Sequence, residues 1–324
     1  MFQAGYEKGL AEQDIVLENK TITENGYYRP STGTGFGAIE VQVTNADTLT
    51  NFLRNRNGSC LFANLSNSDS NIRNSLKDIN FSVLTNCGYM FQNSKLSGMA
   101  PEMDLSGVNM THYMFEGCGM LTGIPQYNIS KVHYSRGMFK ACANLKAIPQ
   151  LDFGNGTDFG YMFNGCASLL SVPEIDTRKA TDLEAMFSGC VSLKEIGGID
   201  MRNATKVGSM FMGCISLEKV NLKNIIYSFT LGSIDGYPEN MELESLINIA
   251  YELHSTSSTK TVTMGAVNLG KLSNVYVKLI PITEEMRAED EFVDLKKPFE
   301  ICDSTDEGAM SIPDYTLTKM WRLQ

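Results

Sequence analysis

The chain of 324 residues has few of the side chains that metal, cofactor and nucleic-acid sites require. It holds 3 histidines and 1 tryptophan, and its formal net charge is −10. The histidines, His112, His133 and His254, form none of the closely spaced pairs that bind zinc. No run of Lys and Arg is present, and the counterion release that drives nucleic-acid binding needs such clusters. We therefore expect no metal, no cofactor and no nucleic-acid partner.

Long apolar segments are also missing. No stretch reaches the roughly 18 to 20 apolar residues that would span a bilayer. The residues after Met1 show neither the basic start nor the apolar centre of a secretion signal. We expect no membrane insertion and, unless a leader was removed, no secretion. Hydrophobic residues make up 43% of the chain and charged residues 20%, a balance typical of an ordered chain.

Catalytic signatures are equally scarce. The sequence has no HExxH pair and no GxSxG nucleophile turn. The segment GAVNLGK, Gly265 to Lys271, matches the first seven positions of a P-loop. Leu272 stands where the magnesium-binding hydroxyl belongs, however, and the residues from Asn274 to Ile280 favour a strand over a helix. The GTGFG segment at 33–37 lacks a surrounding β-α-β pattern, so we expect no enzymatic activity.

What the sequence does contain is an internal repeat. Six Met-Phe pairs recur every 24 residues, beginning at Met90, Met114, Met138, Met162, Met186 and Met210. A period in this range is typical of leucine-rich repeats, in which each copy makes one coil. A unit this small cannot bury its own apolar face, so the copies must stack. Residues 88–226 are therefore predicted to form about six coils.

Other columns keep the same period. Cysteine recurs at Cys118, Cys142, Cys166, Cys190 and Cys214, and leucine at Leu121, Leu145, Leu169, Leu193 and Leu217. A polar column holds Asp104, Asn128, Asp152, Asp176, Asp200 and Asn224. Within one copy, Leu169 to Val172 suits a short strand. The apolar spacing of Lys179 to Ser188 favours a helical or 3₁₀ turn.

These columns are interpreted as structural. The thiols behave as small buried hydrophobes, because no CxxC pair occurs and five ladder members cannot all pair as disulfides. The Met and Phe columns are expected in the core. The Asp/Asn column is expected to turn the chain by bonding its own backbone. A calcium ladder is the alternative, although one carboxylate per coil falls short of the six or more oxygens that calcium prefers.

The pattern MFxGCxSLxxIPxID resembles the BspA-like leucine-rich repeats of bacterial surface proteins and phage-encoded proteins. The resemblance covers residues 88–226 and implies a β-rich α/β repeat solenoid, a right-handed leucine-rich-repeat array used in adhesion or recognition, without catalytic residues. The end copies depart from the pattern. Ser94 replaces the first cysteine, and Gly197 and Asn221 replace a proline, as expected of capping copies.

The flanks divide into four segments. Residues 1–50 predict an N-terminal helix plus a β-hairpin module, with a turn at Asn25-Gly26 and a strand through Ile39, Val41 and Val43. Residues 51–87 are expected to form the N-terminal cap of the solenoid. Residues 227–281 predict a C-terminal α/β cap, with a helix from Asn240 as N-cap to Leu253. These flanks resemble modules of bacteriophage tail and minor structural proteins.

Residues 282–324 form an acidic C-terminal arm. It is interpreted either as a solvated extension or as an assembly arm that docks on a neighbouring subunit. The second interpretation is favoured because the apolar residues Phe299, Tyr315 and Trp321 are costly to expose. It implies a homo-oligomer.

Two sets of residues are candidates for binding a partner. Outward residues of the strand ladder are Thr122, Lys146, Leu170, Lys194, Glu195 and Glu218. An aromatic patch beside the Met-Phe columns holds Tyr89, Tyr113, Tyr134 and Tyr161, together with His112. Such rings suit sugars and protein hot spots alike. A half-buried structural role for these tyrosines is the alternative.

The resulting hypothesis is a non-enzymatic phage virion protein with a tail, fibre or capsid-decoration role. Its partners would be other virion proteins, or a protein or glycan on the host surface. The alternative is a bacterial cell-surface adhesin of the same repeat class with its leader removed.

Overall fold

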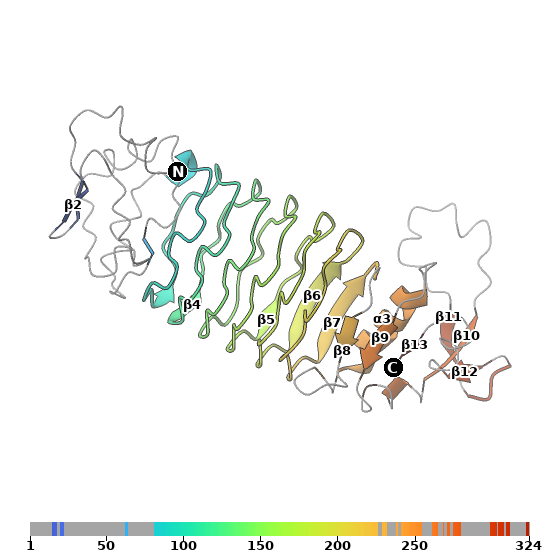
Figure 1. Cartoon of the computed structure of the whole chain (residues 1–324). Helices are drawn as coiled ribbons and strands as arrows, with labels where there is room; N and C mark the ends of the chain where they lie inside the picture. Colours follow the sequence, from blue (N-terminus) through green and yellow to red (C-terminus); the bar gives the residue numbers. More distant parts are fainter. Residues whose placement is uncertain are drawn as a thin grey trace.

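The computed structural model describes residues 81–225 without interruption (Figure 1). The other described residues are 15–17, 20–22, 62–63, 229–231, 238, 241–254, 261–264, 268, 271–272, 275–279, 299–302, 304–307, 309–311 and 322–323.

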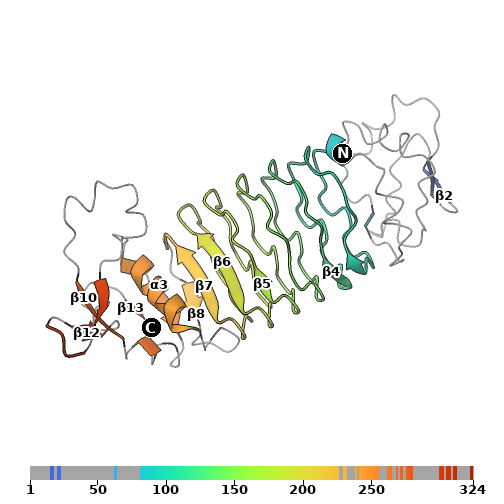
Figure 2. The same ribbon diagram turned by 180° about the vertical axis from the view of Figure 1, so that it is seen from behind.

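Residues 81–225 form a row of stacked coils, one for each 24-residue copy (Figures 1 and 2). Short parallel strands line one side of the row: β3 (Gly98–Met99), β4 (Leu121–Gly123), β5 (Ser171–Val172), β6 (Glu195–Asp200) and β7 (Lys219–Lys223). β3 pairs with β4, and β5, β6 and β7 form a three-stranded sheet. The strand predicted over Leu169 to Val172 is confirmed in its second half, by β5. The arrangement is consistent with a repeat solenoid.

Strand length follows the loss of proline. β6 and β7 are the longest strands of the row, at 6 and 5 residues, and they belong to the copies in which Gly197 and Asn221 replace proline. Proline has no N–H to donate to a ladder, so its loss lets pairing continue. The register shifts between Ile196 and Gly198. The departures seen in sequence therefore lengthen the strands at this end.

The corner that carries each Met-Phe pair is held by hydrogen bonds to the next coil. In the fifth copy the N–H groups of Ala185 and Phe187 donate to the carbonyls of Gly208 and Met210, at 2.9 and 3.1 Å. The N–H of Ser188 instead donates three residues back, to Ala185, at 3.1 Å. Alternate residues thus join the coils, and those between them close tight turns.

Left-handed residues flank each Met-Phe pair. The residues before the pair are Tyr89, Tyr113, Gly137, Tyr161, Ala185 and Ser209, and those two positions after its Phe are Asn93, Gly117, Ala141, Gly165, Gly189 and Gly213. Their φ angles lie between 50° and 81°. A right-handed helix cannot continue through such residues. The expected helical or 3₁₀ segment from Lys179 to Ser188 is therefore wrong, and this stretch is a series of turns.

The core runs through the row as ladders of identical side chains. The phenylalanine rings stack with centroids 5.3 to 6.2 Å apart and interplanar angles of 20° or less. The stack holds Phe62, Phe91, Phe115, Phe139, Phe163, Phe187 and Phe211. The Met, Cys and Leu columns are also buried. The prediction that these columns point inward is therefore confirmed. Each large apolar side chain of this kind contributes about 1.5 to 3 kcal/mol to stability when fully buried.

The core begins before the first recognised copy. Phe62 stacks on Phe91, and its N–H donates to the carbonyl of Met90 at 2.7 Å. The 3₁₀ helix η1 (Phe81–Val83) leads into the first coil and buries Phe81. Further toward the N-terminus, β1 (Ile15–Leu17) and β2 (Lys20–Ile22) form an antiparallel pair. The turn and strand expected at 25–26 and 39–43 lie outside the described residues.

A helix covers the last strand of the row. α3 (Leu243–His254) packs against β7. The Oγ of Ser245 accepts the N–H of Val220 at 3.1 Å, and the Oδ1 of Asn248 accepts the N–H of Leu222 at 3.2 Å. The helix prediction is confirmed, although α3 begins three residues after Asn240. Side-chain oxygens thus replace a further strand at the edge of the sheet.

The remaining strands form two small sheets. β9 (Thr261–Met264) lies between β8 (Phe229–Leu231) and β13 (Arg322–Leu323), and both pairings are parallel. β10 (Tyr276–Leu279) lies between β11 (Phe299–Cys302) and β12 (Met310–Ser311), and both pairings are antiparallel.

Three short strands of the C-terminal arm, β11, β12 and β13, pair with other strands of the same chain. Phe299 lies in β11, opposite Leu279. These strands therefore belong to the fold of their own chain and are not a solvated extension, while docking of the arm on a neighbouring subunit stays a prediction. Sequence alone could not reveal this, because the partner strands lie tens of residues away. Tyr315 and Trp321 lie outside the described residues.

Candidate functional site

The strand-face candidates form one outward column of the array. Thr122, Lys146, Leu170 and Lys194 are exposed, and Glu218 is half-buried. Backbone bonds join each to the next, such as that from the Leu170 N–H to the Lys146 carbonyl at 3.0 Å. Glu195, also exposed, begins the adjacent column on β6. The structure thus brings all six strand-face candidates together.

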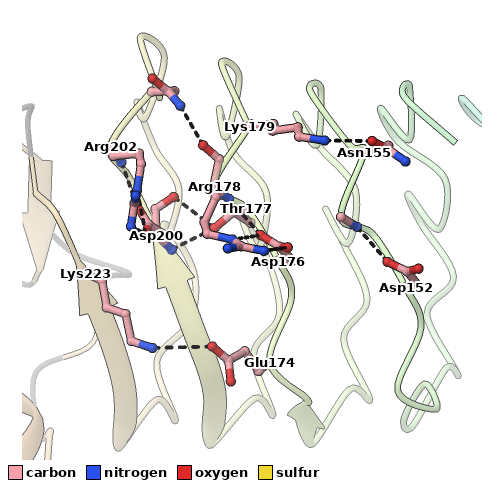
Figure 3. Close-up of polar contacts among 12 residues, drawn as sticks. Asp152, Asn155, Glu174, Asp176, Thr177, Arg178, Lys179, Asp200, Arg202 and Lys223 are labelled. Atoms are coloured by element: carbon pink, nitrogen blue, oxygen red, sulfur yellow. Dashed lines mark hydrogen bonds and ion pairs between the residues drawn. The ribbon is translucent and has the colours of Figure 1, made fainter. Parts of the chain in front are cut away.

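The later coils of this face hold paired charges. Lys194 and Glu218 lie 3.8 Å apart, and Lys223 and Glu174 lie 3.4 Å apart (Figure 3). Exposed pairs of this kind contribute about 0 to 1 kcal/mol to stability. Leu170, by contrast, is 51% exposed and lies between two lysine-bearing coils. The face therefore offers a varied surface that its own fold does not require.

The aromatic candidates gather on the corner beside the Met-Phe pairs. The rings of Tyr89 and Tyr113 stack at 5.1 Å with an interplanar angle of 15°. The His112 ring meets Tyr89 edge-on at the same distance. Tyr161 lies two coils beyond Tyr113 in the same column. Tyr134, which is 49% exposed, lies in a neighbouring column whose residues are joined from coil to coil by isolated parallel β-bridges. We call this second column the bridge column.

Two cations lie against these rings. The Lys140 Nζ lies 5.6 Å from the ring centre of Tyr113, and the Arg136 Cζ lies 4.9 Å from that of Tyr161. Gly137 leaves room for the Tyr113 ring, because a Cβ there would lie 2.3 Å from it. We call the group formed by Tyr89, His112, Tyr113, Tyr134, Arg136, Lys140 and Tyr161 the tyrosine face.

Carboxylates hold the cations of the tyrosine face in place. Glu116 accepts a hydrogen bond from the Gln92 Nε2 at 2.7 Å and one from the Lys140 Nζ at 2.8 Å. Arg136 reaches across two coils, donating to Asp158 at 3.3 Å and to Asp182 at 2.8 Å. A chain of fixed donors and acceptors thus runs beside the rings.

The protonation states of these groups follow from their contacts. The hydrogen bond to Glu116 raises the pKa of Lys140 despite partial burial. Burial alone would raise the pKa of Asp182, but hydrogen bonds from the Glu184 N–H, Lys206 and Arg136 outweigh it and lower this pKa. Burial lowers the pKa of His112. At neutral pH Lys140 and Asp182 are therefore charged and His112 is neutral.

Three tyrosines of the tyrosine face have a strained, left-handed backbone conformation. Tyr89, Tyr113 and Tyr161 have φ of 57°, 53° and 59°, a region that costs a non-glycine residue about 1 to 2 kcal/mol. The same column holds Ala185 and Ser209 in later coils at φ of 50° and 55°. The coil can therefore be built without an aromatic ring at this position.

The Asp/Asn column turns the chain, as predicted. The Oδ1 of Asp152 accepts the N–H of Gly154 at 2.9 Å, and that of Asp200 accepts the N–H of Arg202 at 3.0 Å (Figure 3). The same bond to the residue two positions on is made by Asp104, Asn128 and Asp176. Within the described residues, no group of three or more His, Cys, Asp or Glu could hold a metal ion.

Two of the aspartates in this column form ion pairs with arginines. Arg178 contacts Asp176 at 2.7 Å, and Arg202 contacts Asp200 at 2.6 Å (Figure 3). The Arg178 hydrogen bond lowers the pKa of Asp176. The carboxylates of these two coils therefore already have cationic partners, which weakens the calcium-ladder alternative.

The cysteine column is a ladder of hydrogen bonds as well as a packed core. Each thiol donates to the phenylalanine carbonyl of the preceding coil at 3.0 or 3.1 Å, as Cys166 does to Phe139. Ser94 makes the equivalent bond, from its Oγ to the Phe62 carbonyl at 2.6 Å. Ser94 is thus a substitute for cysteine and not a loss of the motif.

Burial makes these thiols unreactive. It raises the pKa of Cys118, Cys166 and Cys214 to about 12, so each stays protonated at neutral pH. All five cysteines of the column are free and buried. The structural interpretation of the column is confirmed, with a hydrogen-bonding role that its sequence spacing did not indicate.

The segment that resembles a P-loop has structural contacts. Asn268 is buried, and its Oδ1 accepts the N–H of Met241 at 3.0 Å while its Nδ2 donates to the Pro238 carbonyl at 3.1 Å. The Lys271 Nζ donates to the Met241 carbonyl at 2.6 Å. These side chains anchor the region before α3. The strand expected after the segment is confirmed by β10.

Sequence reasoning missed the left-handed columns and the partners of Arg136. The glycines at 117, 165, 189 and 213 were a usable signal, because glycine favours positive φ. Tyrosine gives no such signal. Asp182 lies 46 residues from Arg136, and spacing does not reveal which way a long side chain turns.

These features define the class of the chain. It is a repeat protein with buried Phe and Cys columns at a 24-residue spacing and short parallel strands. Residues 59–172 and 157–226 match the model of the family described as Mycoplasma protein of unknown function, DUF285, and the chain belongs to this family. Searches of curated proteins and of solved structures found no match. In the part of the chain that the structure describes, no helix is long and apolar enough to cross a membrane.

Proposed function

We propose that residues 88–226 form a right-handed leucine-rich-repeat solenoid of the BspA-like class, and that the protein binds a partner without catalysing a reaction. The parallel strands support this handedness, since crossovers between parallel strands are almost always right-handed. The repeated pattern from Met-Phe through Cys to Leu supports the BspA-like class.

One observation carries the binding proposal. The outward strand column holds a hydroxyl, a cation, an aliphatic group, a cation and an anion at Thr122, Lys146, Leu170, Lys194 and Glu218. The neighbouring inward column is leucine in all five coils. Because both columns share one backbone ladder, the fold does not require this outward variety. A recognition surface would use it.

We place the protein on a phage particle, in a tail, fibre or capsid-decoration role, because its flanks resemble modules of such proteins. Its partners would then be other virion proteins, or a host-surface protein or glycan, and a homo-oligomer is part of this proposal. The family description names Mycoplasma. This description supports a second candidate function, that of an adhesin on a bacterial cell surface.

The test is binding of the full chain to whole cells. Bacterial cells serve the phage setting and epithelial cells serve the adhesin setting. We call the surface formed by Thr122, Lys146, Leu170, Lys194, Glu195 and Glu218 the strand face. Lys146→Glu reverses a charge on this face, whereas Lys131→Glu makes the same charge change at an exposed position outside the strand face and the tyrosine face. We expect at least about tenfold weaker binding for Lys146→Glu alone, equivalent to about 1.4 kcal/mol. Equal binding by both variants, or no binding by the parent chain, would overturn the proposal.

A further inference from the structure

The tyrosine face is confined to the first four coils. Its column changes from Tyr89, Tyr113 and Tyr161 to Ala185 and Ser209. The bridge column changes from Tyr134 to Asp158 and then to other polar residues. The rings therefore make a localised patch and not a feature of every copy. A patch of this kind, on a core that continues unchanged beneath it, needs a local explanation.

The chemistry of the patch is half apolar and half polar. Tyr89 and Tyr113 present stacked rings, and Tyr134 is half-exposed beside them. Next to the rings, Glu116 is fixed between Gln92 and Lys140. Fixed donors and acceptors beside aromatic surface suit a ligand that has C–H faces and hydroxyl edges.

The patch has no excess of positive charge. Arg136 lies within 3.5 Å of Asp158, Asp182 and Glu184, and Lys140 lies 2.8 Å from Glu116. Lys206 also pairs with Asp182, at 3.1 Å, so three cations face four carboxylates. Each cation is thus already paired with a carboxylate, and the face has no positive excess to attract an anion. A neutral ligand therefore suits this face better than an anionic one.

We propose that the tyrosine face binds a neutral glycan. The inference rests on the proposed binding function of the array and names a ligand class for it. The half-exposed Tyr134 ring can take the C–H face of a sugar ring, while the Tyr89 and Tyr113 rings, stacked on each other, would meet the glycan with their edges. The sugar hydroxyls would bond the Gln92, Glu116 and Lys140 side chains, which are already ordered and so lose little freedom on binding.

The spacing of the face suits an extended glycan. Side chains recur once per coil, and the Tyr89 and Tyr113 rings lie 5.1 Å apart. This advance is close to the length of one sugar unit in an extended chain. A glycan lying along the array would therefore place successive units over successive coils, from Tyr89 toward Tyr161.

The backbone of the coil does not require the rings. Gly137 occupies the tyrosine column at φ of 59°, where glycine meets no steric penalty. Tyr113 and Tyr161 flank it at the same backbone geometry. Ala185 and Ser209 adopt the same geometry in the later coils, so the positive φ belongs to the repeat and the rings are not needed to build it.

The experiment uses glycine substitutions in the tyrosine column. Tyr113→Gly removes a ring and gives the position the residue that Gly137 already has there. Ser209→Gly is the matched control, because it makes the same backbone change in the same column outside the tyrosine face. Tyr134→Ala removes a half-exposed ring from the neighbouring column. The labelled full chain is applied to an array of neutral and acidic oligosaccharides, and titration with the best neutral oligosaccharide gives Kd.

We expect binding to neutral oligosaccharides, and a Kd about tenfold weaker for Tyr113→Gly and for Tyr134→Ala but unchanged for Ser209→Gly. Preference for acidic oligosaccharides, or equal binding by all variants, would overturn the glycan assignment. Binding to cells through the Lys146 face without any glycan binding would overturn the assignment alone and leave the proposed function standing. Absence of both activities would overturn both.

Discussion

The first four coils and the last two solve the same backbone problem with different surfaces. Both need a left-handed residue before each Met-Phe pair, and the early coils use Tyr89, Tyr113 and Tyr161 where the late coils use Ala185 and Ser209. The early corner is aromatic and charge-paired. The difference shows that the repeat fixes the backbone conformation at this position while leaving its side chain free to vary.

The late corner has a different exposed composition. Val191, Met212 and Ile215 are 40%, 45% and 60% exposed there. Beneath both corners the phenylalanine stack continues, with Phe115 and Phe139 5.9 Å apart and the later pairs 5.6 and 6.2 Å apart. The core therefore does not distinguish the two regions, and any functional difference must come from outward residues.

Removing one ring from the core should have the largest effect, and should be similar in both regions. Phe139→Ala and Phe187→Ala each leave a cavity in a fully buried stack, so we expect each to lower the unfolding free energy by about 3 to 5 kcal/mol. Urea unfolding monitored by circular dichroism measures this. A difference of more than about 2 kcal/mol between the two variants would show that the core is not equivalent along the row.

The cysteine ladder predicts an asymmetry between two substitutions. Cys166→Val removes the thiol donor, although the Phe139 carbonyl still accepts the Cys142 N–H at 3.0 Å, so we expect a destabilisation of about 0.5 to 1.5 kcal/mol. Cys166→Ser keeps a donor, as Ser94 does, and should destabilise it less. The same unfolding measurement compares them. A valine variant as stable as the parent would show that the thiol contributes packing alone.

The ion pairs under the tyrosine face predict a pH dependence. Because the pKa of Asp182 is lowered in the folded state, its stabilisation is present above its unfolded pKa of about 3.9 and is lost as pH falls through the folded pKa. Asp182→Asn should be about 1 to 2 kcal/mol less stable than the parent at pH 7, with the gap closing in acid. Unfolding at a series of pH values tests this. A gap independent of pH would contradict the role of this carboxylate charge.

The smallest expected effect is a gain in stability in the late coils. Ser209 is exposed and has a positive φ, which glycine adopts without steric strain. Ser209→Gly should therefore raise the unfolding free energy by up to about 1 kcal/mol. Thermal unfolding at one protein concentration measures it. A loss of stability would mean that the serine side chain stabilises this corner.

Periodicity predicted the core well because identical residues in register must stack. Met162, Phe163 and Cys166 could be placed inward from spacing alone, and the strand predicted over Leu169 to Val172 was found in its second half. Phe62 could not, because 91 − 62 = 29 residues separate it from Phe91 and break the 24-residue period. The turns between Lys179 and Ser188 were missed because the spacing of apolar residues carries no information on the sign of φ.

The candidate site was predicted in part for the same reason. Register grouped Tyr89 and Tyr113, whose shared column follows from the period. It could not show that Arg136 crosses two coils to Asp182 or that the Tyr113 ring lies over Gly137. Those contacts depend on side-chain direction, which the packing of neighbouring coils decides.

The most direct test of this account measures stability and binding together on Tyr113→Gly. If the ring is kept for binding, relief of the strained backbone should offset most of the lost contact with Tyr89, so the unfolding free energy should change by less than about 1 kcal/mol, while the Kd for a neutral oligosaccharide weakens about tenfold. A variant that unfolds more easily yet binds as the parent does would contradict the account. That result would assign the tyrosines to structure.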